Sequence, residues 1–230
     1  MLPQALILDL DGTLADTEPL HDHAWDVVLQ GIPSEVVAGA REKWIGMSSA
    51  EIARGLITAF HLRQSVEGML RRKRRRFRRL ARKGLAPFPG LTEELARWRT
   101  ARVPIAVATS GSRREAHLVL RKLRLPVRFE AVVTCDDVPR AKPAPDCYFL
   151  AAELLGKHPK DCTAIEDSIN GMTAAVAAGT HVLAVSASAL ESLPAGVERV
   201  FPSTVAALGW LRNGRSAAEP ESGSFSTFSR

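Results

Sequence analysis

The chain has 230 residues, of which 46% are hydrophobic, a composition that permits a sizeable core and argues against global disorder. No apolar run approaches the roughly 18 residues of a membrane-spanning helix, and no basic segment with a longer apolar stretch precedes the first predicted strand, so we expect neither a membrane span nor a secretory signal. The expected location is the cytoplasm, where the three cysteines, Cys135, Cys147 and Cys162, would stay reduced.

The formal net charge of +6 is very unevenly distributed. Residues 71–83 hold ten of the basic residues, so that without this run the net charge would be −4. We expect a helix with a solvated arginine face, because the apolar residues around the run fit one helical stripe. The alternatives are steering of anionic substrates and binding to nucleic acid or an acidic membrane surface. Phe77 is the one aromatic residue in the run, which is too little for base stacking, so nucleic acid is not the expected partner.

The predicted elements begin with a strand at residues 5–10, after which only helices are expected up to residue 86. The first helix is capped by Asp16 or Thr17 and has Pro19 in its first turn. Further helical segments are expected to end near Trp44 and to cover residues 50–60 and 65–83. We therefore predict an all-helical insert at residues 17–87, which ends at a stiff connector with prolines 87 and 89.

Helices and strands alternate over the rest of the chain. Helices are predicted at residues 92–100, 113–123, 146–156, 170–178 and 203–211, and strands at 103–108, 131–134, 163–165, 181–185 and 200–201. This alternation predicts an α/β fold with a doubly wound, parallel, Rossmann-like sheet that helices cover on both faces. The core would comprise residues 1–16 and 88–211. The tail at 212–230 is rich in Ser, Gly, Glu and Pro and is expected to be disordered.

Polar side chains follow four of the predicted strands. Ligands of doubly wound sheets bind beyond the carboxyl ends of the strands, so these side chains are expected to form one site. A lone strand-end aspartate pair or threonine is usually a solvated turn or a helix cap, and the interpretation depends on all four positions occurring together. The set comprises the carboxylates Asp9, Asp11, Glu166 and Asp167, the hydroxyl and amide donors of Thr109, Ser110 and Gly111, and the ammonium of Lys142.

This set of groups suits phosphoryl transfer. A phosphate dianion repels a carboxylate nucleophile, so a divalent cation has to lie between them and take up charge. The four carboxylates offer the oxygen ligands that Mg²⁺ prefers, while the hydroxyl, the amides and the ammonium can hold phosphoryl oxygens. One of the paired aspartates can attack phosphorus, and the other can protonate the leaving oxygen and later activate water.

Four short motifs contain these residues: Asp9-Leu10-Asp11-Gly12-Thr13, Thr109-Ser110, Lys142-Pro143-Ala144-Pro145-Asp146 and Glu166-Asp167-Ser168-Ile169-Asn170-Gly171. Over about residues 4–205 the chain thereby resembles the haloacid dehalogenase superfamily of phosphohydrolases, and within it the beta-phosphoglucomutases and the sugar-phosphate or phosphoglycolate phosphatases. The resemblance implies that the helical insert is a cap that closes over the site, and that residues 16–21 form its hinge.

The same resemblance implies a role for each site residue. Asp9 would be the nucleophile and Asp11 the general acid and base, while Thr109 and Lys142 would bind phosphate. Mg²⁺ would bind the Asp9 side chain, the Asp11 carbonyl and Asp167, with Glu166 close by. For His21 two alternatives stay open: it reaches the site when the cap closes, or it faces solvent or packs near Trp25.

The reaction is predicted from the cap loop. The mutases of this subfamily resemble one another in having a lysine just before the loop glycine and an arginine three residues after it, where this chain has Ile45 and Ser49 around Gly46. Arg54 is a weaker substitute, one helical turn further on. We therefore predict a Mg²⁺-dependent phosphatase that hydrolyses a small phosphomonoester (a sugar phosphate, phosphoglycolate or a nucleotide) through an aspartyl-phosphate.

Two alternatives to the phosphatase remain. A phosphosugar mutase similar to beta-phosphoglucomutase shares the aspartyl-phosphate and differs in the group that accepts the phosphoryl. A non-catalytic anion-binding protein is disfavoured, because no catalytic position is missing from the motifs. The sequence gives no indication of the oligomeric state.

Overall fold

A six-stranded parallel sheet forms the centre of the molecule. The computed structural model describes residues 2–30, 49–185 and 193–214. The strands are β1 (Ala5–Leu8), β2 (Ile105–Ala108), β3 (Ala131–Val133), β4 (Cys162–Glu166), β5 (His181–Val185) and β6 (Val197–Phe201). Their order is β3-β2-β1-β4-β5-β6, and each neighbouring pair is parallel. This order reverses direction between β1 and β4, which is where doubly wound sheets bind ligands.

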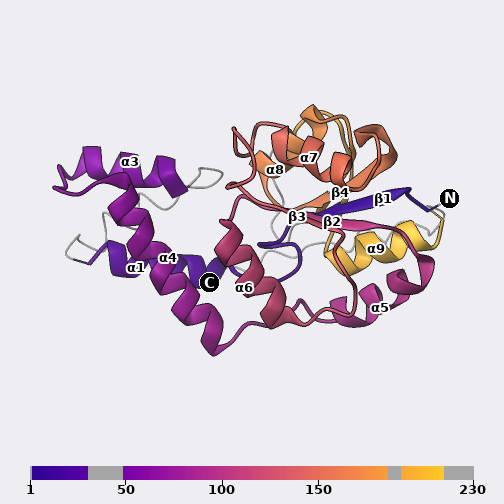
Figure 1. Cartoon of the computed structure of the whole chain (residues 1–230), viewed down its shortest axis with the longest axis horizontal. Coiled ribbons are helices and arrows are strands. Elements are labelled where there is room, and N and C mark those ends of the chain that lie inside the picture. Colours follow the sequence, from indigo (N-terminus) through magenta and orange to yellow (C-terminus); the bar gives the residue numbers. More distant parts are fainter. Residues whose placement is uncertain (1, 31–48, 186–192, 215–230) are drawn as a thin grey trace, which may run out of the picture.

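Helices cover both faces of the sheet, which confirms the predicted doubly wound α/β fold. Residues alternate along β1, so that Leu6 and Leu8 pack on one face and Ala5 and Ile7 on the other. The first face is covered by α5 (Leu91–Ala101), α6 (Arg113–Leu123) and α9 (Thr204–Arg212), and the second by α7 (Asp146–Leu154) and α8 (Ile169–Ala177). Figure 1 shows α7 and α8 above the sheet and α5 and α9 below it.

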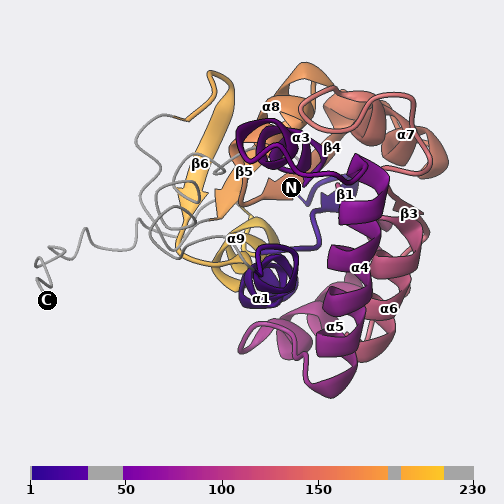
Figure 2. The same cartoon turned by 90° about the vertical axis from the view of Figure 1, so that its left-hand side faces the viewer.

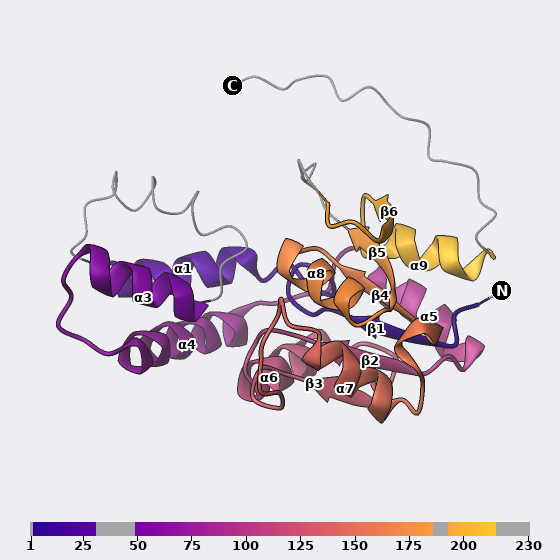
Figure 3. The same cartoon turned by 90° about the horizontal axis from the view of Figure 1, so that it is seen from above.

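Three helices between β1 and β2 form a separate group with a small core of its own. They are α1 (Glu18–Val28), α3 (Ser49–Ala59) and α4 (Val66–Lys83), and they pack through buried residues such as Trp25, Ile52 and Met69. Figures 1 and 3 show them beside the sheet, beyond its end. The last of them, α4, also packs against α6 (Figure 2). The described residues between β1 and β2 thus contain no strand, as predicted, and the segment expected to end near Trp44 lies outside them.

The structure differs from the predicted elements at several boundaries. The first strand ends at Leu8 instead of residue 10, because the chain turns at Gly12, whose φ of +84° favours glycine and whose amide donates to the Ala15 carbonyl. The last strand begins at Val197 instead of residue 200. It is an edge strand with charged side chains that hide its strand character, and its residues alternate between half-buried and exposed before the buried Phe201. A short 3₁₀-helix at Pro159–Asp161 was not predicted.

Two further expectations can be compared with the structure. All three cysteines are free thiols. None of the helices in the described ranges is long and apolar enough to cross a membrane. The expected tail begins where α9 ends, and residues 215–230 lie outside the described part of the chain.

The first turn of α9 is tied to the loop that follows β1. The buried Thr204 hydroxyl donates a hydrogen bond of 2.6 Å to the Thr13 carbonyl. Thr204→Val keeps the shape and leaves this carbonyl without its donor, so we expect the free energy of unfolding to fall by about 1–2 kcal/mol, measured by urea denaturation. The control is Thr100→Val at an exposed threonine that donates 2.7 Å to the Arg97 carbonyl, where the change should stay within about 0.5 kcal/mol. An equal fall in the free energy of unfolding of both variants would contradict a stabilising role of the hydrogen bond from Thr204 to the Thr13 carbonyl.

Candidate active site

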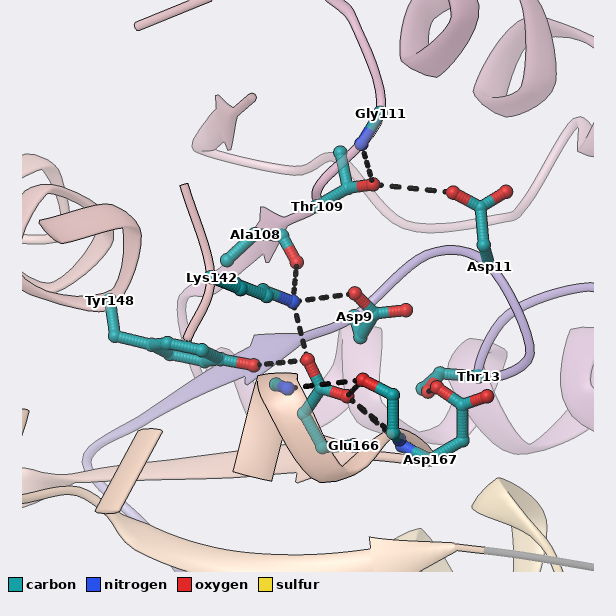
Figure 4. Close-up of polar contacts among 12 residues, drawn as sticks. Asp9, Asp11, Thr13, Ala108, Thr109, Gly111, Lys142, Tyr148, Glu166 and Asp167 are labelled. Carbon is teal, nitrogen blue, oxygen red and sulfur yellow. Dashed lines mark hydrogen bonds and ion pairs between the residues drawn. The ribbon is translucent and has the colours of Figure 1, made fainter. Parts of the chain in front are cut away.

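Three carboxylates meet at the carboxyl ends of β1 and β4. Asp9 directly follows β1, and its amide continues the ladder by donating to the Ile165 carbonyl at 3.0 Å. Glu166 ends β4, and Asp167 follows it. Carboxylate oxygens of these three acids all lie within 4.8 Å of one another. The structure therefore brings together these predicted residues from two motifs that are far apart in the sequence (Figure 4).

The ammonium of Lys142 joins this group from the loop after β3. It donates to Asp9 Oδ1 at 2.6 Å, to the Ala108 carbonyl at 2.9 Å and to Glu166 Oε1. The residue is 5% exposed. Burial lowers the pKa of Lys142, but the charges of Asp9 and Glu166 raise it well above its ordinary value, so the ammonium keeps its proton.

Glu166 is held by donors from several sides. One of its oxygens accepts a hydrogen bond of 2.8 Å from the buried Tyr148 hydroxyl, besides the bond from the lysine. The other accepts from the amides of Asp167 and Ser168 and from the Ser168 hydroxyl, at 3.1–3.2 Å. A side chain at Gly171 would overlap this carboxylate. The start of α8 can therefore lie this close to Glu166 only because residue 171 is a glycine.

The group carries more negative than positive charge. Burial and the charge of Glu166 raise the pKa of Asp9 well above its ordinary value, and the same two causes raise the pKa of Asp167 to about 8. Such shifts mean that the neighbouring carboxylates resist ionising together when no further cation is present. A divalent cation with oxygen ligands would remove this conflict.

Asp11 lies on the other side of the site, towards Thr109 (Figure 4), and contacts the start of α1. Its carboxylate accepts from the hydroxyl of Thr17 at 2.7 Å and from that of Thr109 at 3.3 Å. Nε2 of His21 lies 3.6 Å from the same carboxylate, and the His21 ring stacks on Phe77 of α4 at 4.2 Å between centroids. Of the two alternatives for His21, the structure therefore shows the one in which it reaches the site.

The pKa of Asp11 is set by opposing effects. Burial raises it, but the contacts with His21 and Thr17 and the charge of Lys73 bring it below the ordinary value. In this arrangement Asp11 is therefore ionised at neutral pH.

The predicted phosphate donors follow β2. The amide of Thr109 donates to the Val133 carbonyl, which extends the sheet by one residue, and its hydroxyl accepts from the Gly111 amide at 2.9 Å. Thr109 is buried beside Asp11, whereas the neighbouring Ser110 is exposed. The structure thus places Thr109 and Gly111 with the second aspartate, and Ser110 at the rim of the site.

Two residues at the site were missed in the sequence. Lys73 of α4 is 7% exposed, and its ammonium donates to the Ser49 hydroxyl at 2.9 Å. It was hidden among nine other basic residues, although its spacing of four residues from Phe77 on the apolar stripe was a usable signal. Tyr148 was missed because it lies on α7, whereas its partner Glu166 stands on β4. Arg54, considered above as a substitute cation, is exposed on α3.

Comparison with known proteins agrees with this geometry. The family model described as haloacid dehalogenase-like hydrolase matches residues 3–179. The chain therefore belongs to the haloacid dehalogenase-like hydrolase family.

Its similar proteins include phosphatases and a mutase. Hexitol phosphatase A of Escherichia coli is 33% identical over 81% of this chain and 84% of its own length. Beta-phosphoglucomutase of Bacillus subtilis is 31% identical over 79% of this chain and 83% of its own length. Among solved structures, CbbY from Rhodobacter sphaeroides in complex with phosphate has a TM-score of 0.74 and 26% identity over 89% of this chain and 96% of that one.

The raised pKa values predict how metal and pH act on stability. Because the folded protein holds the protons of Asp9 and Asp167 more tightly than the unfolded chain does, the metal-free protein should lose stability as the pH rises from about 4 towards 8. Mg²⁺ replaces these protons, so it should raise the melting temperature more at about pH 8 than at about pH 6, as measured by differential scanning calorimetry. Asp167→Asn should shrink this difference. A shift that is independent of pH would contradict the charge balance described here.

Proposed function

We propose that the protein is a Mg²⁺-dependent phosphatase that hydrolyses a small phosphomonoester, of the sugar-phosphate or phosphoglycolate type, through an aspartyl-phosphate. The observation that carries the proposal is the position of Asp9. Its carboxylate is held by the Lys142 ammonium at 2.6 Å and lies between the Glu166–Asp167 pair on one side and the Thr109–Asp11 pair on the other.

The residues present fit a divalent cation. The three clustered carboxylates and the raised pKa values of two of them call for added positive charge. The Asp9 and Asp167 side chains and the Asp11 carbonyl would hold the ion. Glu166 stands behind them as an anchor, because both of its oxygens already accept hydrogen bonds within the protein. When bound, the cation supplies the charge neutralisation that lets a carboxylate approach a phosphate dianion.

Asp9 and Asp11 then divide the chemistry. A carboxylate oxygen of Asp9 forms a bond to phosphorus while the bond from phosphorus to the ester oxygen breaks, and Asp11 gives its proton to the leaving alcohol. In the second step Asp11 takes a proton from water as the water oxygen attacks phosphorus, which restores Asp9. Asp11 is ionised in the free site, which suits the second step. The charge of a bound phosphate raises its pKa, which favours the protonated form that the first step needs.

Lys142 and Thr109 would hold the phosphoryl oxygens during both steps. The ammonium offsets charge that grows on these oxygens in the transition state, and its anchorage between two carboxylates keeps it in place. Replacing Lys142 would leave the buried Asp9 and Glu166 without their shared cation.

Hydrolysis is preferred to the mutase reaction because of the cap. We assign residues 1–16 and 88–211 to the core and residues 17–87 to a helical cap. A mutase has to grip a second phosphate and exclude water, and Ser49 stands where the related mutases have an arginine. The cap still offers Lys73, which is the cap cation that hydrogen-bonds to this serine. We assign Lys73, in place of Arg54, to the non-reacting part of the substrate.

The proposed phosphatase activity is tested with Asp9→Asn. The purified protein should release inorganic phosphate from a panel of small phosphomonoesters with Mg²⁺ and should lose this activity with a chelator. Asp9→Asn removes the nucleophile, so kcat should fall by at least about 10³-fold while the melting temperature is retained or raised. The control Asp161→Asn changes an acid that is remote from the site and should keep full activity.

Two results would contradict the proposal. Unchanged turnover in Asp9→Asn would remove the nucleophile assignment. Interconversion of hexose 1- and 6-phosphates that is faster than phosphate release would favour the mutase.

The role of Lys73 is tested separately. Lys73→Met keeps the length of the side chain and removes its charge, so kcat/KM should fall by about tenfold to a hundredfold, as is usual for loss of a charged hydrogen bond. Steady-state kinetics with the best substrate of the panel measures the change. The matched control is Lys83→Met, at an exposed lysine on the same helix. If both variants lose activity equally, the effect belongs to the helix charge as a whole and not to this residue.

A further inference from the structure

The helix α4 has two sides of opposite character. Its buried side carries Met69, Lys73 and Phe77, which face the other cap helices and the site. At 100° per residue, residues 71, 75, 78 and 82 fall on the opposite side, with residue 79 beside them. We call Arg71, Arg75, Arg78, Arg79 and Arg82 the arginine face; four of these side chains are exposed and that of Arg78 is half-buried.

In the part of the chain that the structure describes, the arginine face lacks neutralising partners. Within the described ranges, none of its five guanidinium groups forms an ion pair with a carboxylate; the one ion pair of the neighbouring basic residues is Arg74 with Glu115, at 3.9 Å on the α6 side. The acid nearest in sequence on α4 is Glu67 in its first turn. Like charges three and four residues apart on a helix repel one another. Bound anions would reduce this repulsion among the arginines.

The charged surface extends onto α6. The Lys122 ammonium donates to the Arg82 carbonyl at 2.9 Å, which adds a cation at the end of the arginine face. Figure 2 shows α4 and α6 next to each other. From Ala116 to Phe129 the chain has no acidic residue. The face runs from residue 71 to residue 82, about 16 Å at the rise of an α-helix.

Substrate steering does not account for this face. Lys73, the residue of α4 whose charge acts on Asp11, lies on the opposite side of the helix. A helix is about 10 Å across with its side chains, which equals about one Debye length at 0.1 M salt, so the arginine face acts on the site more weakly than Lys73 does.

We propose that the arginine face binds the phosphodiester backbone of nucleic acid without sequence preference. Eight of the ten basic residues in 71–83 are arginine, whose planar guanidinium pairs with phosphate oxygens through two hydrogen bonds. A straight row of cations matches a polymer with evenly spaced anions. The one aromatic residue of the run, Phe77, is buried, so bases have nothing to stack on and only the backbone is recognised.

An acidic lipid surface is a poorer match. Helices that lie on membranes insert apolar side chains beside their basic ones, and the apolar side chains of α4 are committed to the protein core. The proposal reverses the expectation from the sequence, where the same run was interpreted as solvated. The difference comes from the structure, which aligns five arginines on one side and leaves them without carboxylate partners in the described part of the chain.

The test is binding of the full-length protein to fluorescently labelled oligonucleotides, both a duplex and an unrelated single strand, measured by anisotropy at several salt concentrations. Contact with four or five phosphates gives a slope of about −4 for log K against log salt, so a rise from about 50 to 200 mM salt should weaken duplex binding on the order of a hundredfold. Duplexes of different sequence should bind alike.

Matched triple variants locate the binding surface. Arg75→Gln with Arg79→Gln and Arg82→Gln should weaken binding at least tenfold and reduce the salt slope by about three units. Arg99→Gln with Arg102→Gln and Arg128→Gln removes the same charge at exposed positions outside α4 and should keep binding within about twofold. Melting temperatures establish that both variants are folded.

Three results would overturn the proposal. The first is no binding of either oligonucleotide at about 50 mM salt, which would leave the face merely solvated. The second is equal weakening in both triple variants, which would make the effect one of net charge. The third is binding to vesicles with phosphatidylserine but not to oligonucleotides, which would assign the face to lipid.

Discussion

The site depends on one ammonium group placed between two carboxylates. Lys142 joins the end of β1, through Asp9, to the end of β4, through Glu166, and it also contacts the carbonyl at the end of β2. A single buried cation therefore holds three neighbouring strand ends in register. Buried carboxylates that lack such a partner take up protons, and a protonated Asp9 is neither a nucleophile nor a metal ligand. The charge of Lys142 counters this tendency in Asp9 without abolishing it, and a divalent cation at the site would complete the neutralisation.

The fold and most of this group could be predicted because each motif is short and stands at a strand end. Parallel strands bring their carboxyl ends to one edge, so Asp9 and Glu166 had to meet once β1 and β4 lay side by side. Lys142 reaches them from the loop after β3. Residues whose role depends on packing between distant segments could not be found in this way. Tyr148 faces Glu166 only because α7 packs against the sheet over β1, β2 and β3. Lys73 is distinguished from its basic neighbours only by the side of α4 that is buried.

The site is shared between two parts of the chain with separate cores. His21, Phe77 and Lys73 come from α1 and α4, and the clustered carboxylates come from the sheet. The contact between His21 and Asp11 and the packing of Phe77 in the main core join the two parts. Any displacement of α4 along α6 would move Lys73 relative to Asp11. The same helix carries the arginine face on its outer side, so one element presents a cation to the site and a row of cations to solvent.

The hydrogen bond from Thr204 to the Thr13 carbonyl links the turn after β1 to the first turn of α9. Thr13 belongs to the turn that carries Asp11, and Thr204 is translated 191 positions after it. The central strand β1 likewise gains both of its neighbours only after β4 has been made. A nascent chain therefore cannot assemble the site before β4 has been made, and the hydrogen bond that fastens the turn with Asp11 forms only after Thr204 has followed.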